Sequence, residues 1–580
     1  MSEANLARLC IVGTGFSGTA AFFHLVNALI DNKHRITSVE IITIEERPVN
    51  GPGYPYAPYE LLPSHLCNNQ ARMMSLAGND FYDWLSENRL RLASEFPALI
   101  RETHPAVLLS KWEPDPDAFY PRALFGVYLE ERFKATVLKA RRHGIKVTSL
   151  NGYRAVDGYR LSGKFSVVIE RSDGSGKEVL SRIDKLLLST GHWVPEDTDW
   201  AMISDTFLNS PYPYAKLRTS LTSWSESVRG KTLTCFVKGM GPSGIDAIMS
   251  LAESGQFHYS DSAHVTAYTP ASDEASVTIV AGSRCGFFPA VRGESVDYQF
   301  QYLTEDSFSE LERILGRKLG LTDILSMIDC ELRDATSGKI GWQDIIEPKF
   351  KSAYEKLRFD VMCPHENNLI HTILLKARRM KFYRHLNEFE KEIYDKELDT
   401  HFIRIAVPIP QSNAEKLIAL FESGKLESVK MGYQASANPA IHDNHYKLTF
   451  IEDDHDVSRQ VDTVIRASGQ DFRLSLHPSR LVAALAEREE LLANMEGHYS
   501  TGGIMLDSDE SYGVMCRDPE TGKIILSPFI ASYGVLTRYW QNERNFSAAF
   551  VEAAMWLSEE WSVFCTGQSA LVVAESASQK

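Results

Sequence analysis

The sequence contains few cysteines and no long apolar run. Its eight cysteines are scattered singly along 580 residues, and none forms a Cys-x-x-Cys pair. Scattered thiols are typical of a reducing compartment, and the missing pair argues against a disulfide reductase. No run approaches the roughly 20 apolar residues that a membrane span needs. The first apolar run is interrupted by glycines, unlike a signal peptide, so we expect a cytoplasmic protein.

Basic residues are also fewer than acidic residues. Lysine and arginine number 61 against 76 aspartates and glutamates, which gives a net charge of −15. Nucleic acids and anionic membranes select basic surfaces, so we expect neither as a main partner. The chain has no Gly-x-Ser-x-Gly elbow and no His-Glu-x-x-His pair, so hydrolase chemistry has no support. The length and the 44% hydrophobic content fit two or three globular domains.

A short apolar run at 9–12 leads into a glycine-rich turn and then into a helix-favouring segment. The turn has the Gly-x-Gly-x-x-Gly spacing and consists of Gly13, Thr14, Gly15, Phe16, Ser17 and Gly18. In a dinucleotide site such glycines allow a tight turn, approach of the pyrophosphate and close helix packing. The phosphates then lie at the helix N-terminus. The next apolar strand ends in Glu45 and Glu46, which suit ribose hydroxyls.

The same device occurs again in the middle of the chain. An apolar strand at 232–238 leads into Gly239, Met240, Gly241, Pro242, Ser243 and Gly244. The following strand, 277–282, ends in Ser283 and Arg284. An arginine at this position suits a 2′-phosphate, whereas a glutamate suits ribose hydroxyls. We therefore predict FAD at the first turn and NADPH at the second, with NADH as the alternative.

Two further segments resemble each other. Each is predicted to be the strand that closes one nucleotide-binding module and returns the chain to its sheet. The run 183–191 ends in Thr190 and Gly191, and the run 461–469 ends in Ser468 and Gly469. A buried strand that ends in a small residue and glycine brings backbone close to a bound nucleotide. The duplication predicts two dinucleotide sites. A late strand followed by Gly534 is predicted to return to the first site.

We expect an α/β fold with two Rossmann-like dinucleotide-binding domains, each of three layers (ββα), and a helical insertion. The stretch 47–85 is rich in Asn, Gln, Met, Tyr and His, which suits packing against a planar polar ligand, although an ordinary surface loop is the alternative. The predicted segments are 1–204, the first part of the FAD-binding domain; 205–299, the NADPH-binding domain; 300–425, the insertion; 426–470, the return strands of the nucleotide-binding domains; and 471–580, the C-terminal part of the FAD-binding domain.

Several motifs together resemble a known family. They are the two glycine turns, Gly51–Tyr54, His65–Asn68, Met74-Ser75, Asp80–Leu85, Pro121-Arg122, Phe125–Leu129 and Ser283–Pro289. The chain is similar to flavoproteins known as FAD/NAD(P)-binding proteins, relatives of the class B flavin monooxygenases that include N-hydroxylating ornithine and lysine monooxygenases. The resemblance covers most of the chain outside the insertion. One departure is Val535, which follows Gly534 where the family has an aspartate.

The resemblance implies an FAD-dependent, NADPH-using monooxygenase. Reduced FAD would form a C4a-(hydro)peroxide with O₂, and the nitrogen of a small amine, amino acid or hydroxylamine-type substrate would attack it. The residues expected in the pocket are Asn68, Gln70, Arg72 and His65 as catalytic candidates, Asn69, Met74 and Arg122 as cofactor contacts, and Arg538 and Arg544 as carboxylate holders. A homo-oligomer is one alternative for the assembly.

Two other functions stay open from the sequence. One is an NAD(P)H oxidase or acceptor oxidoreductase that inserts no oxygen, and the other is a nucleotide-binding redox sensor or partner protein. A metal site is not expected. His442-x-x-His445 and the acidic turn 453–456 are read as parts of a hairpin, because the histidines His442 and His455 lie at opposite ends of a strand.

Overall fold

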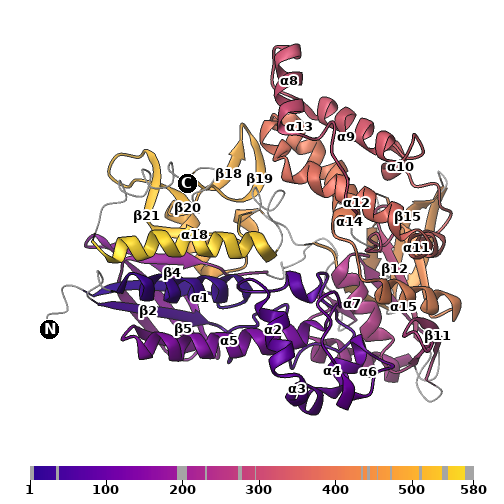
Figure 1. Cartoon of the computed structure of the whole chain (residues 1–580), viewed down its shortest axis with the longest axis horizontal. Helices are drawn as coiled ribbons and strands as arrows, with labels where there is room; N and C mark the ends of the chain where they lie inside the picture. Colours follow the sequence, from indigo (N-terminus) through magenta and orange to yellow (C-terminus); the bar gives the residue numbers. More distant parts are fainter. Residues whose placement is uncertain are drawn as a thin grey trace.

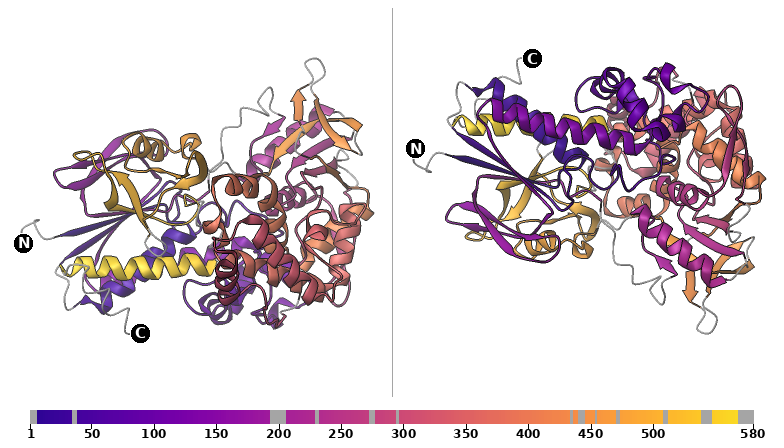
Figure 2. Two further views of the ribbon diagram at one scale, coloured as in Figure 1. Left: turned by 90° about the horizontal axis from the view of Figure 1, so that it is seen from above. Right: turned by 90° about the horizontal axis from the view of Figure 1, so that it is seen from below.

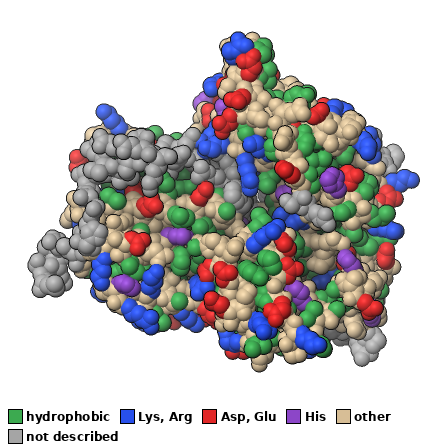
Figure 3. Space-filling model, in the orientation of Figure 1, with side chains coloured by type: hydrophobic (Ala, Val, Ile, Leu, Met, Phe, Trp, Pro, Cys, Tyr) green, Lys and Arg blue, Asp and Glu red, His purple; other side chains and the backbone are tan. Residues whose placement is uncertain are grey.

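The computed structural model describes residues 6–33, 38–192, 206–228, 232–271, 277–293, 296–432, 436–439, 445–452, 455–469, 473–507, 512–537 and 547–567. Two parallel sheets lie in two separate halves of the molecule (Figure 1). We call the half that contains the N-terminal strand the first unit and the other half the second unit. Acidic and basic side chains are interspersed over the face shown in Figure 3.

The first unit is built on a six-stranded sheet with the order β20-β21-β7-β1-β2-β3. The strands are β1 (Ala7–Val12), β2 (Val39–Glu45), β3 (Lys146–Asn151), β7 (Lys185–Leu188), β20 (Gly513–Arg517) and β21 (Ile524–Ser532). All neighbours pair in parallel except β20 and β21. Because β21 pairs with β7, a strand near the C-terminus completes the sheet that the first residues begin.

Alternate side chains of β1 pack into two different cores. Leu9 and Ile11 pack against helices, whereas Cys10 and Val12 pack against an antiparallel sheet. Successive side chains of a strand point to opposite faces, so a strand buried on both faces needs a continuous apolar run. The layers are helices α1 (Phe16–Asp31), α5 (Arg122–Arg142) and α18 (Ser547–Cys565), the parallel sheet, and strands β4 (Tyr153–Leu161), β5 (Lys164–Arg171) and β6 (Lys177–Ile183). Figure 2 shows these three layers edge-on.

Smaller elements extend both cores of the first unit. Helices α2 (Asp80–Glu87), α3 (Arg89–Glu95) and α4 (Pro97–Thr103) share the core of α1 and α5, and α16 (Arg480–Glu487) packs on the side of β4–β6. A hairpin, β18 (Ala493–Glu496) and β19 (Tyr499–Ile504), lies nearer the insertion. None of the helices that the structure describes is long and apolar enough to cross a membrane.

The second unit repeats this design with five parallel strands in the order β13-β12-β9-β17-β8. They are β8 (Phe207–Leu208), β9 (Leu233–Lys238), β12 (Val277–Ser283), β13 (Leu426–Lys430) and β17 (Thr463–Arg466). Cys235 and Val237 face the helices of this unit. Phe236 faces an antiparallel sheet of three strands that lie between residues 436 and 461. The flanking elements are α6 (Tyr214–Val228), α7 (Pro242–Leu251), α11 (Ala353–Met362), α15 (Gln411–Glu422), β14 (Ser436–Pro439), β15 (Tyr446–Glu452) and β16 (His455–Val461), with the hairpin β10 (Gln256–Tyr259) and β11 (Val265–Thr269). The predicted fold class is confirmed.

The predicted insertion divides into two parts. Helices α11 and α15 belong to the helical layer of the second unit. The other helices have a core of their own. They are α8 (Glu305–Leu315), α9 (Leu321–Ala335), α10 (Trp342–Ile346), α12 (Pro364–Arg379) and α14 (Asp399–Ala406), while α13 (Glu388–Ile393) precedes α14 without contributing to this core. The hairpin β18–β19 of the first unit contacts α13, because the His498 backbone N–H donates to Glu388 Oε1 (2.7 Å) and Lys391 pairs with Glu496.

Phe165 tests the layered core of the first unit. It is fully buried between the parallel sheet and β4–β6, with its ring centre 5.7 Å from that of Phe529. We expect Phe165→Ala to lower the free energy of unfolding of this unit by about 3–5 kcal/mol, because truncation leaves a cavity. Chemical denaturation measures the change. Val179→Ala on neighbouring β6 is the control, since Val179 is 54% exposed; an equal loss in both variants would contradict the assignment of this core.

Candidate functional site

The first glycine turn joins β1 to α1, and its three glycine positions leave little or no room for a Cβ atom. Gly13 has a φ of +88°, and a Cβ atom there would collide with the Ser189 carbonyl oxygen. A Cβ at Gly18 would collide with the Gly13 oxygen, and one at Gly15 would lie 3.3 Å from the Gly53 Cα. Gly15 caps α1 without a side-chain hydrogen bond. The first-turn N–H groups of the helix are therefore left without a side-chain cap, as a phosphate site requires.

The ends of β7 and β21 converge on this turn. The Tyr533 hydroxyl donates to the Ser17 carbonyl (2.6 Å), and a Cβ at Gly534 would lie 3.5 Å from Ser17 Oγ. Ser189 Oγ donates to the Gly13 carbonyl (2.7 Å). Thr190 Oγ1 is buried and has no hydrogen-bond partner among the described residues. A buried hydroxyl without a partner beside an uncapped helix N-terminus fits a bound dinucleotide, so the residues present suit FAD.

The two glutamates after β2 have partners within the protein. The Glu45 carboxylate accepts from the Thr14 backbone N–H (2.8 Å) and from Thr14 Oγ1 (3.0 Å), and it is buried. Glu46 forms an exposed ion pair with Arg154. Glu45 thus fixes the glycine turn to the end of β2. Ribose binding by either carboxylate stays a prediction.

The second glycine turn has the same construction. Gly239 has a φ of +117°, and a Cβ there would lie 2.6 Å from the Ala467 carbonyl oxygen. A Cβ at Gly244 would collide with the Gly239 oxygen, whereas a Cβ at Gly241 would meet nothing within 4 Å. Gly241 caps α7 without a side-chain hydrogen bond, and Pro242 begins the helix, followed by Ser243. Ala467 at the end of β17 thus occupies the place that Ser189 has in the first unit, and Ser468 and Gly469 follow it as Thr190 and Gly191 follow Ser189.

The predicted phosphate-binding arginine lies at the end of β12, beside β9. Ser283 Oγ accepts from the Gly286 N–H (3.0 Å) and closes the turn after this strand. Arg284 is exposed, and its Nη1 donates to the Lys396 carbonyl (3.2 Å). Arg284 therefore lies at the surface between the second unit and the insertion. Binding of a 2′-phosphate stays a prediction.

His65 joins the two units. It is buried, its Nδ1 accepts from the Leu62 N–H (3.3 Å), and its Nε2 lies 3.2 Å from the Asp246 carbonyl and 3.0 Å from Ser250 Oγ on α7. Burial, with the positive charges of Arg122 and Lys416, holds the pKa of His65 well below its ordinary value. Both ring nitrogens are engaged and the ring is neutral at pH 7. These contacts favour a structural role over the catalytic role predicted from the sequence.

Arg122 forms a second link between the units. It is the first residue of α5, and its guanidinium pairs with the Asp246 carboxylate, which also accepts from the Tyr212 hydroxyl. The sequence predicted a cofactor contact for Arg122. The structure instead engages it with Asp246, two residues after the last glycine of the second turn. Sequence reasoning missed Asp246 because an aspartate in that segment has no distinguishing neighbours.

We call the contact between the two units the junction. Some residues of the loop after His65 lie at the junction, and others lie elsewhere in the first unit. The Asn68 carbonyl and Asn69 Oδ1 accept from Arg292 Nη2 at 3.1 and 3.4 Å. Gln70 Oε1 accepts from Arg72 (3.3 Å), and Arg72 pairs with Asp117 at the surface (2.8 Å). Met74 is buried in the helical core. The predicted catalytic role of Arg72 and cofactor contact of Met74 are therefore not favoured, whereas Asn68 and Asn69 lie at the junction.

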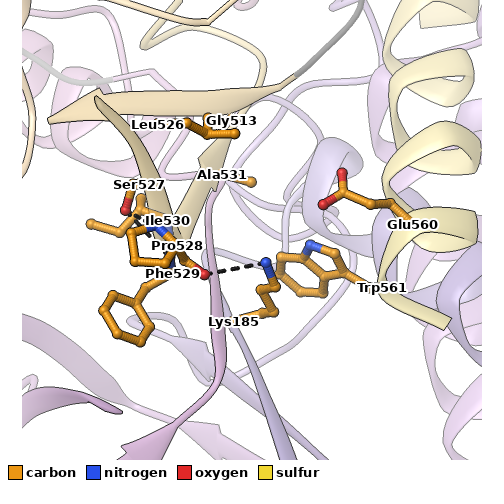
Figure 4. A pocket seen from close by; sticks show the side chains of 10 residues that line it. All are labelled: Lys185, Gly513, Leu526, Ser527, Pro528, Phe529, Ile530, Ala531, Glu560 and Trp561. Atoms are coloured by element: carbon orange, nitrogen blue, oxygen red, sulfur yellow. Dashed lines mark hydrogen bonds between the residues drawn. The ribbon is translucent and has the colours of Figure 1, made fainter. Parts of the chain in front are cut away.

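Other candidate positions do not add to this site. Arg538, Arg544, His442 and residues 453–454 lie outside the described residues. His445 Nδ1 lies 2.7 Å from Asp462 Oδ1, and among the described residues no group of three or more His, Cys, Asp or Glu is placed to hold a metal ion. A cavity of about 130 Å³ is lined by Lys185, Phe529 and Glu560 (Figure 4). Lys185 is at the start of β7, whereas the first glycine turn contacts Ser189 just after the end of β7. The cavity therefore lies at the opposite end of this strand from the candidate site.

The first unit matches a known family model. Residues 10–193 match the model described as FAD-NAD(P)-binding. The matched segment contains the first glycine turn, the loop through Asn68 and Asn69, and the end of β7 at Thr190. Residues 10–193 form an FAD/NAD(P)-binding domain. The FAD/NAD(P)-binding domain is completed in space by β21 and α18 from the C-terminal part of the chain.

Comparisons over longer parts of the chain find only distant likenesses. The uncharacterized protein YdhS of Escherichia coli is 22% identical over 453 residues, which cover 74% of this chain and 77% of YdhS. An ornithine hydroxylase from Pseudomonas aeruginosa is 12% identical with a TM-score of 0.47, covering 97% of this chain and 99% of the hydroxylase. An L-lysine 6-monooxygenase from Pseudomonas syringae is 11% identical with a TM-score of 0.47, covering 96% and 99%. At these values neither likeness carries the activity of the solved protein over to this chain.

The second glycine turn offers a matched pair of substitutions. Gly241→Ala adds a methyl group in open space, so we expect normal folding and NADP⁺ binding weakened by about tenfold or more, because the methyl would occupy the place predicted for the pyrophosphate. Gly244→Ala forces a collision with the Gly239 oxygen and is expected to destabilise the second unit. Thermal unfolding and calorimetric titration with NADP⁺ separate the two effects. Unchanged NADP⁺ affinity in Gly241→Ala would remove the assignment of this turn.

Proposed function

We propose that this protein is an FAD-dependent, NADPH-using monooxygenase acting on the nitrogen of a small amine, amino acid or hydroxylamine-type substrate. The observation that carries the proposal is the presence of two glycine turns of the same construction in one chain. The first lies within the FAD/NAD(P)-binding domain, and α7 begins at the second. Asp246 and Ser250 of α7 contact Arg122 and His65 of the first unit, so the helix that follows the second turn packs directly against the unit that contains the first turn.

Each turn has residues suited to one cofactor. The first turn of α1 and Thr190 would hold the FAD, and Gly239–Gly244 with Arg284 would hold NADPH. Bound FAD supplies hydride acceptance from NADPH and reaction with O₂. The protein contributes position: Asn68 and Asn69 lie at the junction of the units and would be available to contact a bound cofactor or substrate. Arg292 holds both asparagines in place.

An NAD(P)H oxidase without oxygen insertion is the second candidate. One observation favours it: within the described loop 65–74 both nitrogens of His65 are engaged, so that histidine is not available as an acid or base for a substrate. Release of hydrogen peroxide from a reduced flavin needs no substrate-binding group. The two candidates differ in the fate of O₂: a monooxygenase transfers one oxygen atom to its substrate, whereas an oxidase releases both oxygen atoms in hydrogen peroxide.

The deciding experiment follows NADPH consumption and hydrogen peroxide release across a panel of amines, amino acids and hydroxylamines. A monooxygenase is expected to release less peroxide per NADPH when its substrate is present, and mass spectrometry should find a product heavier by one oxygen atom. Labelled O₂ shows the source of that atom. If the amount of peroxide per NADPH stays unchanged with every compound and no oxygenated product forms, the oxidase assignment replaces the proposal.

Arg284 tests the cofactor preference. We expect Arg284→Ala to raise the KM for NADPH by about 10- to 100-fold, because a charge-assisted hydrogen bond to the 2′-phosphate is lost, and to leave the KM for NADH nearly unchanged. Steady-state kinetics with both nucleotides gives the comparison. Arg313→Ala is the control, since Arg313 is exposed on α8 of the insertion. Equal changes for both nucleotides in Arg284→Ala would show that this arginine does not select NADPH.

A further inference from the structure

The predicted phosphate-binding arginine is held by the insertion. Arg284 follows β12 of the second unit, but its Nη1 donates to the carbonyl of Lys396 in the insertion (3.2 Å). Lys396 lies in a π-helical turn, Tyr394–Leu398, that joins α13 to α14, and we call this segment the π turn. The Lys396 ammonium pairs with Glu392 of α13 (2.5 Å). The guanidinium therefore meets the backbone of the π turn, while the lysine side chain is engaged elsewhere.

The π turn is also fixed to the first unit. Asp395, the residue before Lys396, accepts at Oδ2 from the Tyr383 hydroxyl (2.7 Å) and from the Tyr499 hydroxyl (3.0 Å). Tyr383 is buried in the core of the insertion, whereas Tyr499 is the first residue of β19 in the first unit. Two consecutive residues of the π turn thus contact different units: Lys396 contacts the second and Asp395 contacts the first.

The hairpin β18–β19 extends from the core of the first unit to the insertion (Figure 1). At the end of β19, Ile504 is fully buried in the core beside β4–β6. At the tip, Gly497 lies so close to α13 that a Cβ atom there would collide with the Glu388 carboxylate, and Glu496 pairs with Lys391. The position of the π turn is therefore set by the first unit as well as by the insertion.

Holding an arginine side chain in place strengthens its binding of a phosphate. A side chain loses rotamer entropy when a ligand immobilises it, and a side chain that is already held loses less. A guanidinium has five N–H donors and binds a phosphate through two of them, so the bond to Lys396 is compatible with phosphate binding by Arg284. Single π-helical turns within helices are frequent at functional sites. The contact with the π turn thus prepares Arg284 for an anion.

We propose that Tyr499 is a positioning residue for recognition of the 2′-phosphate of NADPH. Through Asp395 it holds the π turn, and the Lys396 carbonyl of this turn holds Arg284, which binds the phosphate. The inference rests on the NADPH site of the proposed function. It assigns part of the cofactor selectivity of the second unit to a residue of the first unit. NAD⁺ has no 2′-phosphate, so its binding does not depend on Tyr499.

The test compares two nucleotides that differ only in the 2′-phosphate. The full-length protein as purified is titrated by calorimetry with NADP⁺ and with NAD⁺, so that no turnover is needed. We expect Tyr499→Phe to weaken NADP⁺ binding by about three- to tenfold, because one hydrogen bond that holds the π turn is lost, and to change NAD⁺ binding by less than about twofold. Tyr153→Phe is the matched control, since Tyr153 begins β4 and lies against Arg171. FAD content and the unfolding midpoint report the fold of both variants.

A double variant shows whether Tyr499 acts through Arg284. Arg284→Ala alone should weaken NADP⁺ binding by about 10- to 100-fold. In Arg284→Ala/Tyr499→Phe we expect the NADP⁺ affinity of Arg284→Ala within about twofold, because the π turn has no guanidinium left to hold. Losses that simply add would overturn the inference. It would also be overturned by unchanged NADP⁺ affinity in Tyr499→Phe, or by an equal loss of NADP⁺ and NAD⁺ affinity, which indicates a structural role.

The inference and the proposed function fail in different ways. A preference for NADP⁺ that depends on Tyr499, without any oxygenated product in the amine panel, would support the inference and remove the monooxygenase. An oxygenated product, together with a Tyr499→Phe variant that keeps the NADP⁺ affinity of wild type, would support the monooxygenase and overturn the role of Tyr499.

Discussion

Backbone-to-backbone contact between each glycine turn and the end of a neighbouring strand governs the construction of both units. Gly13 lies against Ser189 and Gly239 lies against Ala467 so closely that a methyl group at either glycine would not fit. Each contact requires the returning strand, β7 or β17, to enter the sheet directly beside the first strand. In both units an antiparallel three-stranded sheet precedes that return and covers the face opposite the helices. The layers of each unit follow from this arrangement.

The two units are joined mainly through polar side chains, while their apolar cores remain separate. Arg122 with Asp246, Lys416 with Glu102, and His65 with α7 connect them. Removing one partner of a buried ion pair costs about 3–5 kcal/mol because the other charge is left alone. A junction of this kind specifies one relative orientation through a few directional contacts. Arg292 adds a contact of another kind, because its guanidinium donates to the Asn68 carbonyl and to Asn69 Oδ1.

Much of the fold follows from patterns within short segments. Continuous apolar runs predict strands buried on both faces, and the two glycine turns and the Thr190-Gly191 and Ser468-Gly469 endings identify where the strands meet. These features depend on neighbouring residues, so the sequence displays them. The division of the insertion was not predictable in this way, because α11 and α15 are assigned to the second unit by long-range packing.

The candidate site was less predictable, since its side chains depend on partners far away in sequence. His65, Arg122 and Met74 are polar or adaptable residues in the right segment, yet the structure uses them at the junction or in the core. The residue Asp246, which engages Arg122 and Tyr212, gives no local signal. Arg292 follows the Ser283–Pro289 motif by three residues, but its contact with Asn68 and Asn69 is visible only after folding.

The position of β21 has a consequence for the order in which the chain acquires structure. In the sheet, β21 lies between β7 and β20. Helix α18 packs with α1 on the helical face of the same sheet. During synthesis the whole second unit is available to fold before these last elements emerge, whereas the first unit waits with one edge of β7 uncovered. An uncovered edge strand invites pairing with other chains. The first glycine turn is thus made before the second unit, whereas β21 and α18, which pack beside it, are made after the second unit.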